Sequence, residues 1–152
     1  MALSPDLREF IELLNSHNVE FLVVGAHALA FHGLPRYTKD LDLFIATSPE
    51  NAEALSKVVH EFGFASTGLK RADFETPEIV IQLGMEPHRI DLLTGLSGIT
   101  WEEAWRDRVQ GQLDGIPVPF LSKEIYIQNK LASGRPQDIA DVSRLQRISP
   151  SD

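Results

Sequence analysis

The chain has no cysteine in its 152 residues. This absence excludes disulfide bonds, thiolate zinc sites and cysteine nucleophiles, and it suits a reducing compartment such as the cytoplasm. No apolar run approaches the roughly 20 residues of a membrane span, and the N-terminal segment does not pair a basic stretch with a long apolar one. We therefore expect a cytoplasmic protein with no membrane partner.

Positive charge is also scarce, because 14 lysines and arginines face 22 acidic residues, which gives a formal net charge of −8. Broad non-specific binding to nucleic acid depends on Lys and Arg that neutralise phosphates, so this class of function is disfavoured. The sequence has neither a Gly-x-Gly-x-x-Gly turn nor a Walker lysine loop, which excludes the Rossmann and P-loop readings. The length predicts a single domain over residues 1–152.

Two carboxylates, Asp40 and Asp42, interrupt a run of strand-forming apolar residues. Residues two apart in a strand point to the same face with Cα atoms about 6.6 Å apart, so these two side chains are expected to share a face. Such neighbours repel unless a cation lies between them, and oxygen ligands favour a hard ion such as Mg²⁺. The alternative is an acidic edge strand whose charges only prevent edge pairing.

The residues before this pair favour a binding site. Phe21 to Val24 is a continuous apolar run typical of a buried strand, Gly25 ends it, and a short helix is expected until residues 33–35. A glycine at a strand end lets the backbone approach a ligand closely. The helix that follows offers unpaired N–H groups to a phosphate.

This order of elements resembles the nucleotidyltransferase superfamily. The matching residues are Val24-Gly25-Ala26, thirteen intervening residues, and Asp40-Leu41-Asp42-Leu43. The string GAHALAFHGLPRYTKDLDLFI is most similar to small bacterial members related to AbiEii-type toxins and to minimal nucleotidyltransferases. The resemblance implies an α/β (α+β) nucleotidyltransferase fold, with a mixed β-sheet flanked by helices and with C-terminal helices.

The resemblance also implies an activity, the Mg²⁺-dependent transfer of an NMP from an NTP such as ATP to a hydroxyl acceptor. Asp40, Asp42 and Asp91 would be the catalytic residues and would bind two Mg²⁺ ions, with Mn²⁺ as a substitute. Asp91 stands in the apolar segment from Arg89 to Leu93, the place of the family's third carboxylate. From the residues alone, a structural Asp91 neutralised by Arg89 is equally open.

For the nucleotide, the resemblance implies contacts from Gly25, Ala26, Arg36, Thr38 and Lys130. Ala26 departs from the family pattern of Gly or Ser, so a hydroxyl contact to phosphate is lost there while backbone N–H donation remains. Pairing of Arg36 with one of the nearby aspartates is an alternative, as is a solvated surface position for Lys130.

The acceptor is not readable from the sequence, and a tRNA end, a protein side chain and a small alcohol all stay open. The toxin-like resemblance implies a toxin–antitoxin pair, with an antitoxin protein as partner. A different class of function is a catalytically weak or inactive nucleotide-binding or interaction module with the same fold, which Ala26 motivates.

Local signals predict the remaining elements. Helices are expected over 5–16, 49–62, 123–133 and 137–148, with another starting after Thr100, and strands over 78–83 and 89–93. Asp114-Gly115 predicts a hairpin of residues 109–113 and 116–120, and Pro117 and Pro119 place its second strand at a sheet edge. Residues 64–76 are expected to form a loop with a possible edge strand.

Overall fold

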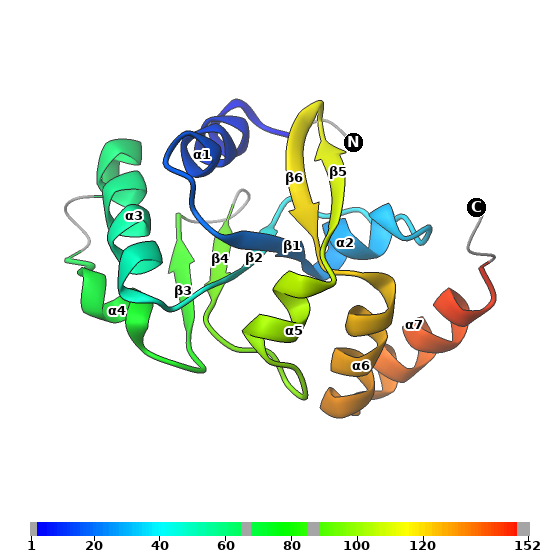
Figure 1. Cartoon of the computed structure of the whole chain (residues 1–152). Coiled ribbons are helices and arrows are strands. Elements are labelled where there is room, and N and C mark those ends of the chain that lie inside the picture. The colour runs from blue at the N-terminus through cyan, green and yellow to red at the C-terminus, as the bar shows by residue number, and fades with distance from the viewer. Residues whose placement is uncertain (1–2, 65–67, 85–88, 149–152) are drawn as a thin grey trace.

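The chain folds into a mixed six-stranded sheet with helices on both faces (Figure 1). The structure is a computed structural model that describes residues 3–64, 68–84 and 89–148. The helices are α1 (Pro5–Ser16), α2 (Gly25–Phe31), α3 (Pro49–Val59) with the π-turn η1 (His60–Phe64), α4 (Arg71–Glu75), α5 (Trp101–Arg106), α6 (Lys123–Ser133) and α7 (Pro136–Gln146). The strands are β1 (Phe21–Val24), β2 (Leu41–Ile45), β3 (Val80–Leu83), β4 (Ile90–Leu93), β5 (Val109–Leu113) and β6 (Ile116–Phe120). The predicted α+β architecture is confirmed.

The strand order is β3-β4-β2-β1-β6-β5. Strand β2 pairs antiparallel with β1 and parallel with β4, so it occupies the middle of the sheet. In this register Asp42 lies opposite Val24 on one side and Asp91 on the other. The pairing therefore brings together segments that are about 50 residues apart in the sequence.

The two faces of β2 differ in chemistry. Leu41, Leu43 and Ile45 are completely buried on one face. On the other face stand Asp42 and Phe44, and Phe44 meets the ring of Trp101 from α5 with centroids 5.0 Å apart. Figure 1 shows α1 and α3 on one side of the sheet and α5 and α6 on the other. The carboxylate of β2 thus faces the α5 and α6 side.

The predicted helix starts are confirmed by hydroxyl caps. Ser4, Ser48, Thr100 and Ser122 each accept a hydrogen bond from the backbone N–H three residues later. A cap of this kind satisfies one of the N–H groups that an α-helix leaves unpaired at its start. Short local signals were therefore sufficient to place α1, α3, α5 and α6.

The loop predicted over residues 64–76 is wrong at its centre, where Arg71–Glu75 forms α4. The helix starts with the Lys70 N–H donating to Asp73 Oδ2 at 2.7 Å, and Phe74 is fully buried. A five-residue helix with one buried side chain is too short to show the periodicity by which helices are recognised in a sequence. Residues 65–67 lie outside the described residues.

The edge position predicted for β6 is also wrong, because β6 lies between β1 and β5. Its contact with β1 is limited to the Val23 and Phe120 pair, whereas its pairing with β5 extends over all five residues. Prolines lack the N–H that a second ladder would need, and Pro117 and Pro119 lie outside the register with β1. The β3 to β4 connection falls mainly on residues 85–88, which lie outside the described residues.

Across the described ranges, no helix combines the length and the apolar character needed to cross a bilayer.

Asn51 ties the first turn of α3 to the ends of β1 and β2. Its side chain is 5% exposed, accepts from the Glu20 N–H at 2.7 Å, and donates to the carbonyls of Glu20 and Ala46 at 3.0 and 2.8 Å. We expect Asn51→Ala to lower the free energy of unfolding by about 2–4 kcal/mol, because it leaves buried backbone groups without partners. Urea denaturation measures the change.

Glu53→Ala, on the exposed side of the same helix, is the control and should change the stability by less than about 0.5 kcal/mol. Equal stability of the Asn51 and Glu53 variants would contradict the role given to Asn51.

Candidate active site

The strand register places two carboxylates side by side. Asp42 on β2 and Asp91 on β4 are direct partners on parallel strands, and both line a cavity of about 220 Å³ together with Gly25. Asp91 is 9% exposed, so its charge is largely removed from water. Asp40 comes one residue before β2 and is not among the residues that line this cavity.

Gly25 makes room for the Asp42 side chain. Its backbone has a φ of +67°, in the left-handed region, and a Cβ atom added there would overlap Asp42 Oδ2 and lie 3.0 Å from Asp42 Cβ and Cγ. Only glycine meets both conditions at low cost. The glycine expected at this strand end therefore leaves the space that the Asp42 carboxylate occupies.

The guanidinium of Arg89 connects the acidic residues. Its Nε lies 3.1 Å from Asp91 Oδ1, and its Nη2 lies 3.3 Å from Asp91 Oδ2 and 3.5 Å from Asp40 Oδ2. Asp91 therefore pairs with Arg89, as the alternative to a catalytic role predicted, and this pair lies among the three carboxylates of Asp40, Asp42 and Asp91. One positive charge among three carboxylates leaves an excess of negative charge.

The environment of Asp42 disfavours its ionised form. Burial is the largest cause, followed by the charges of Asp91 and Asp40 and a side-chain hydrogen bond with Asp91, and together they raise the pKa of Asp42 to about 6. Arg89 opposes this shift. A bound cation would lower the pKa of Asp42 again, because it favours the charged form of the carboxylates.

The donor atoms fit a hard divalent cation, although they are not yet arranged around one point. Asp40 Oδ1 and Asp91 Oδ1 are buried without a hydrogen bond of good geometry, and Mg²⁺ prefers carboxylate oxygens of this kind. In the described part of the chain, no three acidic or histidine side chains already converge as ligands of one ion. Cation binding would therefore require a side-chain rotation within the cluster.

Positive charge also lines this cavity. Lys130 of α6 and Arg135 both line it, and both lie near the carboxylate of Asp138, at 4.0 and 2.8 Å. Asp138 also accepts from the Ser133 hydroxyl at 2.5 Å. Two cations around one anion leave a net positive charge, which suits a phosphate group.

Two cavity residues of α6 were not predicted. Tyr126 and Asn129 line the cavity beside Lys130, and burial raises the pKa of Tyr126 to about 12, which keeps its hydroxyl protonated at neutral pH. Asn129 donates to the Ser97 carbonyl at 2.9 Å. Their i, i+3 and i+4 spacing with Lys130 was a signal in the sequence, because such residues share a helix face.

Three predicted nucleotide contacts lie outside the cavity lining. Arg36 pairs with Asp141 of α7 through two hydrogen bonds of 2.8 and 3.2 Å, so the expected alternative pairing with Asp40 or Asp42 is wrong. Thr38 Oγ1 accepts from the Asp40 N–H at 3.1 Å and so fixes the entry to β2. Ala26 lies in α2 beside Gly25. Nucleotide contacts by these residues stay predictions.

A family model matches residues 3–152, almost the whole chain, and its description is "Nucleotidyl transferase of unknown function" (DUF2204). The chain belongs to this nucleotidyltransferase family. The predicted membership of the superfamily is thereby confirmed, and so is the class of enzyme. Among curated proteins no sequence matches the chain.

Two solved structures share the nucleotidyltransferase fold. A candidate nucleotidyltransferase of Thermotoga maritima, TM1012, is 17% identical with a TM-score of 0.61, and the match covers 95% of each chain. The lincosamide antibiotic adenylyltransferase LnuA, solved with lincomycin bound, is 14% identical with a TM-score of 0.56, covering 98% of this chain and 100% of LnuA. At these identities the likeness concerns the fold alone.

The role of Gly25 is tested by Gly25→Ala, with Gly115→Ala as the matched control. Both glycines have positive φ, but a Cβ at Gly115 meets no atom within 4 Å, whereas one at Gly25 meets Asp42. We expect each variant to lose about 1 kcal/mol of stability from backbone strain, and only Gly25→Ala to lose nucleotidyl transfer as well. Retained activity in Gly25→Ala would contradict the steric role.

The raised pKa of Asp42 predicts a pH dependence of stability. Its pKa is about 6 in the folded protein against the ordinary 3.8 of an aspartate, so the folded state binds more protons between these values and the free energy of unfolding falls as pH rises through them. Asp42→Asn should remove this slope and stabilise the metal-free protein above pH 6 by about 1–3 kcal/mol.

Urea titrations at pH 4 and pH 8 in EDTA measure this difference. The exposed carboxylate of Asp107 gives the control, and Asp107→Asn should retain the wild-type slope. A slope that is the same in Asp42→Asn and the wild-type protein would show that folding does not raise the pKa of Asp42.

Proposed function

We propose that the protein transfers a nucleoside monophosphate from an NTP to a hydroxyl group with the help of Mg²⁺. The observation that carries this proposal is the pairing of Asp42 with Asp91 in one cavity that Lys130 and Arg135 also line. A metal–triphosphate complex needs this combination of anionic and cationic groups. Family membership supports the reaction class.

Asp42 and Asp91 are the residues that would hold the divalent ions, with Asp40 joining them by turning its buried Oδ1 toward the cavity. When bound, such ions neutralise charge on the phosphates and orient the reacting oxygens. Two Mg²⁺ ions, replaceable by Mn²⁺, stay the expectation for this site. The pairing of Arg89 with Asp40 and Asp91 keeps these carboxylates partly neutralised before an ion arrives.

In the reaction, the acceptor hydroxyl oxygen forms a bond to the α-phosphorus while the bond from that phosphorus to the bridging oxygen breaks. Pyrophosphate leaves, and Lys130 and Arg135, which also line the cavity, offset its charge. Asp91 accepts the proton of the hydroxyl, directly or through water. The cavity volume of about 220 Å³ suits the phosphates and not a whole nucleotide, so the nucleoside extends beyond it.

The alternative function, a nucleotide-binding module without turnover, is favoured by Ala26 and by the absence of a ready ligand cluster among the described residues. A role as a toxin with an antitoxin partner stays a prediction from the resemblance. The acceptor is open to small molecules as well, since LnuA is an adenylyltransferase for lincosamide antibiotics.

Label transfer separates the enzyme from the module. Each α-labelled NTP is incubated with the protein in Mg²⁺ or EDTA, with cell RNA, cell protein and the small-molecule fraction as acceptors. We expect transfer that requires the metal and falls about 100-fold or more in Asp42→Asn and Asp91→Asn, because the charge that holds the ions is lost. Asp107→Asn should transfer at the wild-type rate.

Metal-dependent NTP binding without transfer to any acceptor supports the module. Transfer that persists undiminished in both aspartate variants contradicts the assigned site.

A further inference from the structure

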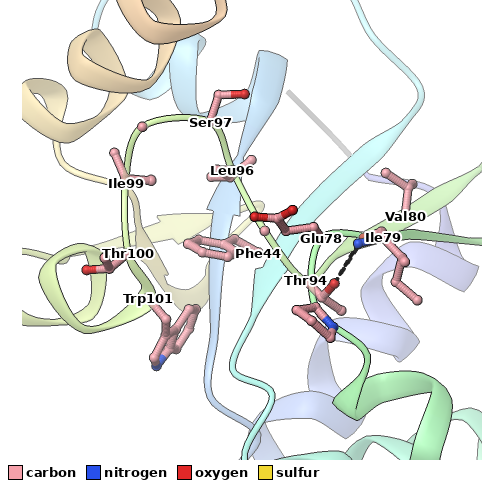
Figure 2. A pocket seen from close by; sticks show the side chains of 13 residues that line it. Phe44, Glu78, Ile79, Val80, Thr94, Leu96, Ser97, Ile99, Thr100 and Trp101 are labelled. Carbon is pink, nitrogen blue, oxygen red and sulfur yellow. Dashed lines mark hydrogen bonds between the residues drawn. The ribbon is translucent and has the colours of Figure 1, made fainter.

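A second, larger cavity of about 680 Å³ adjoins the carboxylate cavity. It is bounded by Phe44 of β2, by residues 77–80 at the start of β3, and by residues 94–101 between β4 and α5 (Figure 2). The two cavities share Val80 and Leu96 as wall residues. A molecule in the larger cavity would therefore lie next to the cavity that Asp42 and Asp91 line.

Both cavities open on the same face of the sheet. Asp42 and Phe44 are two apart on β2, and Val80 is paired with Leu93, two residues after Asp91 on β4. Val80 is 55% exposed although it is a large apolar residue inside a strand. This apolar surface therefore lies accessible at the boundary that the two cavities share.

The walls of the larger cavity combine apolar side chains with hydroxyl groups and one carboxylate. Phe44, Leu96, Ile99 and Trp101 provide the apolar surface, and Glu78 provides the charge. No lysine or arginine is among the described residues that line it. An RNA backbone requires such cations, so these walls disfavour RNA and favour a ligand that is partly apolar and neutral or positively charged.

Glu78 is held at the cavity by a constrained backbone. It has a φ of +56°, which is rare outside glycine, and a Cβ added to Gly95 would lie 3.1 Å from both its Cα and its Cγ. Its neighbour Ile79 is clamped by Thr94, whose Oγ1 accepts from the Ile79 N–H at 2.8 Å. Figure 2 shows the Glu78 carboxylate directed toward the loop that carries Leu96. The side chain is exposed and forms no ion pair within the described residues.

The opposite wall is fixed before a ligand binds. Asn129 of α6 donates to the Ser97 carbonyl at 2.9 Å, and Gln128 donates to the Gly98 carbonyl at 2.8 Å. Trp101 is fixed by Phe44 and by Trp105, with centroids 5.0 and 5.3 Å away. A preformed cavity of this volume is in the range that binds small molecules.

We propose that this cavity binds the acceptor and that the acceptor is a partly apolar small alcohol carrying a positive charge. The ammonium or similar group pairs with Glu78, the apolar part contacts Ile99 and Trp101, and the hydroxyl reaches Asp91 past Val80 and Leu96. The inference rests on the proposed nucleotidyl transfer, in which this hydroxyl oxygen bonds to the α-phosphorus, pyrophosphate leaves and Asp91 takes the proton.

The test uses Glu78→Gln, which removes the charge and keeps the size, with Glu102→Gln on the exposed side of α5 as its matched control. The small-molecule fraction, the RNA and the protein of cells are each offered with labelled NTP and Mg²⁺, and the labelled product is purified. The KM for NTP and the KM for the purified acceptor are then measured separately, as is NTP binding by calorimetry.

We expect label in the small-molecule fraction, on a product whose acceptor is retained by a cation exchanger. Glu78→Gln should raise the KM for that acceptor about tenfold, because the acceptor's positive group loses its charged partner, and leave the KM for NTP unchanged. Glu102→Gln should match the wild-type protein in both constants.

Label in RNA or protein overturns the inference, as does an uncharged acceptor whose KM is the same in both variants. A raised KM for NTP in Glu78→Gln overturns it too and assigns the cavity to the nucleoside. If the protein binds NTP and Mg²⁺ but labels no fraction, the acceptor proposal is refuted while the nucleotide site is supported. If the protein does not bind NTP, the proposed function itself is refuted.

Discussion

Two carboxylates on neighbouring strands, Asp91 buried and Asp42 partly buried, repel each other, and the surrounding residues accommodate this repulsion. Asp42 and Asp91 are register partners, and the sheet holds them together because their strands are paired over four consecutive residues. A cluster of like charges does not increase the stability of a fold. Its presence in the middle of a sheet is the reason to propose a cation that completes the site, and the Arg89 guanidinium partly supplies that charge in the protein alone.

The rest of the site follows from the same geometry. Because side chains alternate along a strand, a shift of the strand pairing by one residue would point the Asp42 side chain into the core and place a leucine at the cavity. Gly25 leaves room on one side of Asp42, and α6 brings Lys130 to the same cavity. The β4 to α5 loop, fixed by Asn129, contributes Leu96 to both cavities. One sheet thus positions the groups that we propose bind the phosphates, the metal and the acceptor.

Local features of this fold were predictable from the sequence, whereas contacts between distant segments were not. The buried strand before Gly25, the serine caps and the Asp114-Gly115 turn each depend on a few adjacent residues. That Asp91 lies beside Asp42 depends on which strands pair, and this contact was predicted from the family resemblance alone. The bond between Arg36 and Asp141 spans 105 residues, and the larger cavity is made by three separate segments, so neither leaves a local pattern.

The most direct measurement is a crystal structure of the protein with Mn²⁺ and a non-hydrolysable ATP analogue, with the anomalous signal used to locate the metal. The account predicts Mn²⁺ bound by oxygens of Asp42 and Asp91, at about the 2.1 Å typical of small divalent ions, with the triphosphate extending toward Lys130. A nucleotide bound elsewhere, with no metal between these carboxylates and Arg89 still paired to Asp40 and Asp91, would contradict it.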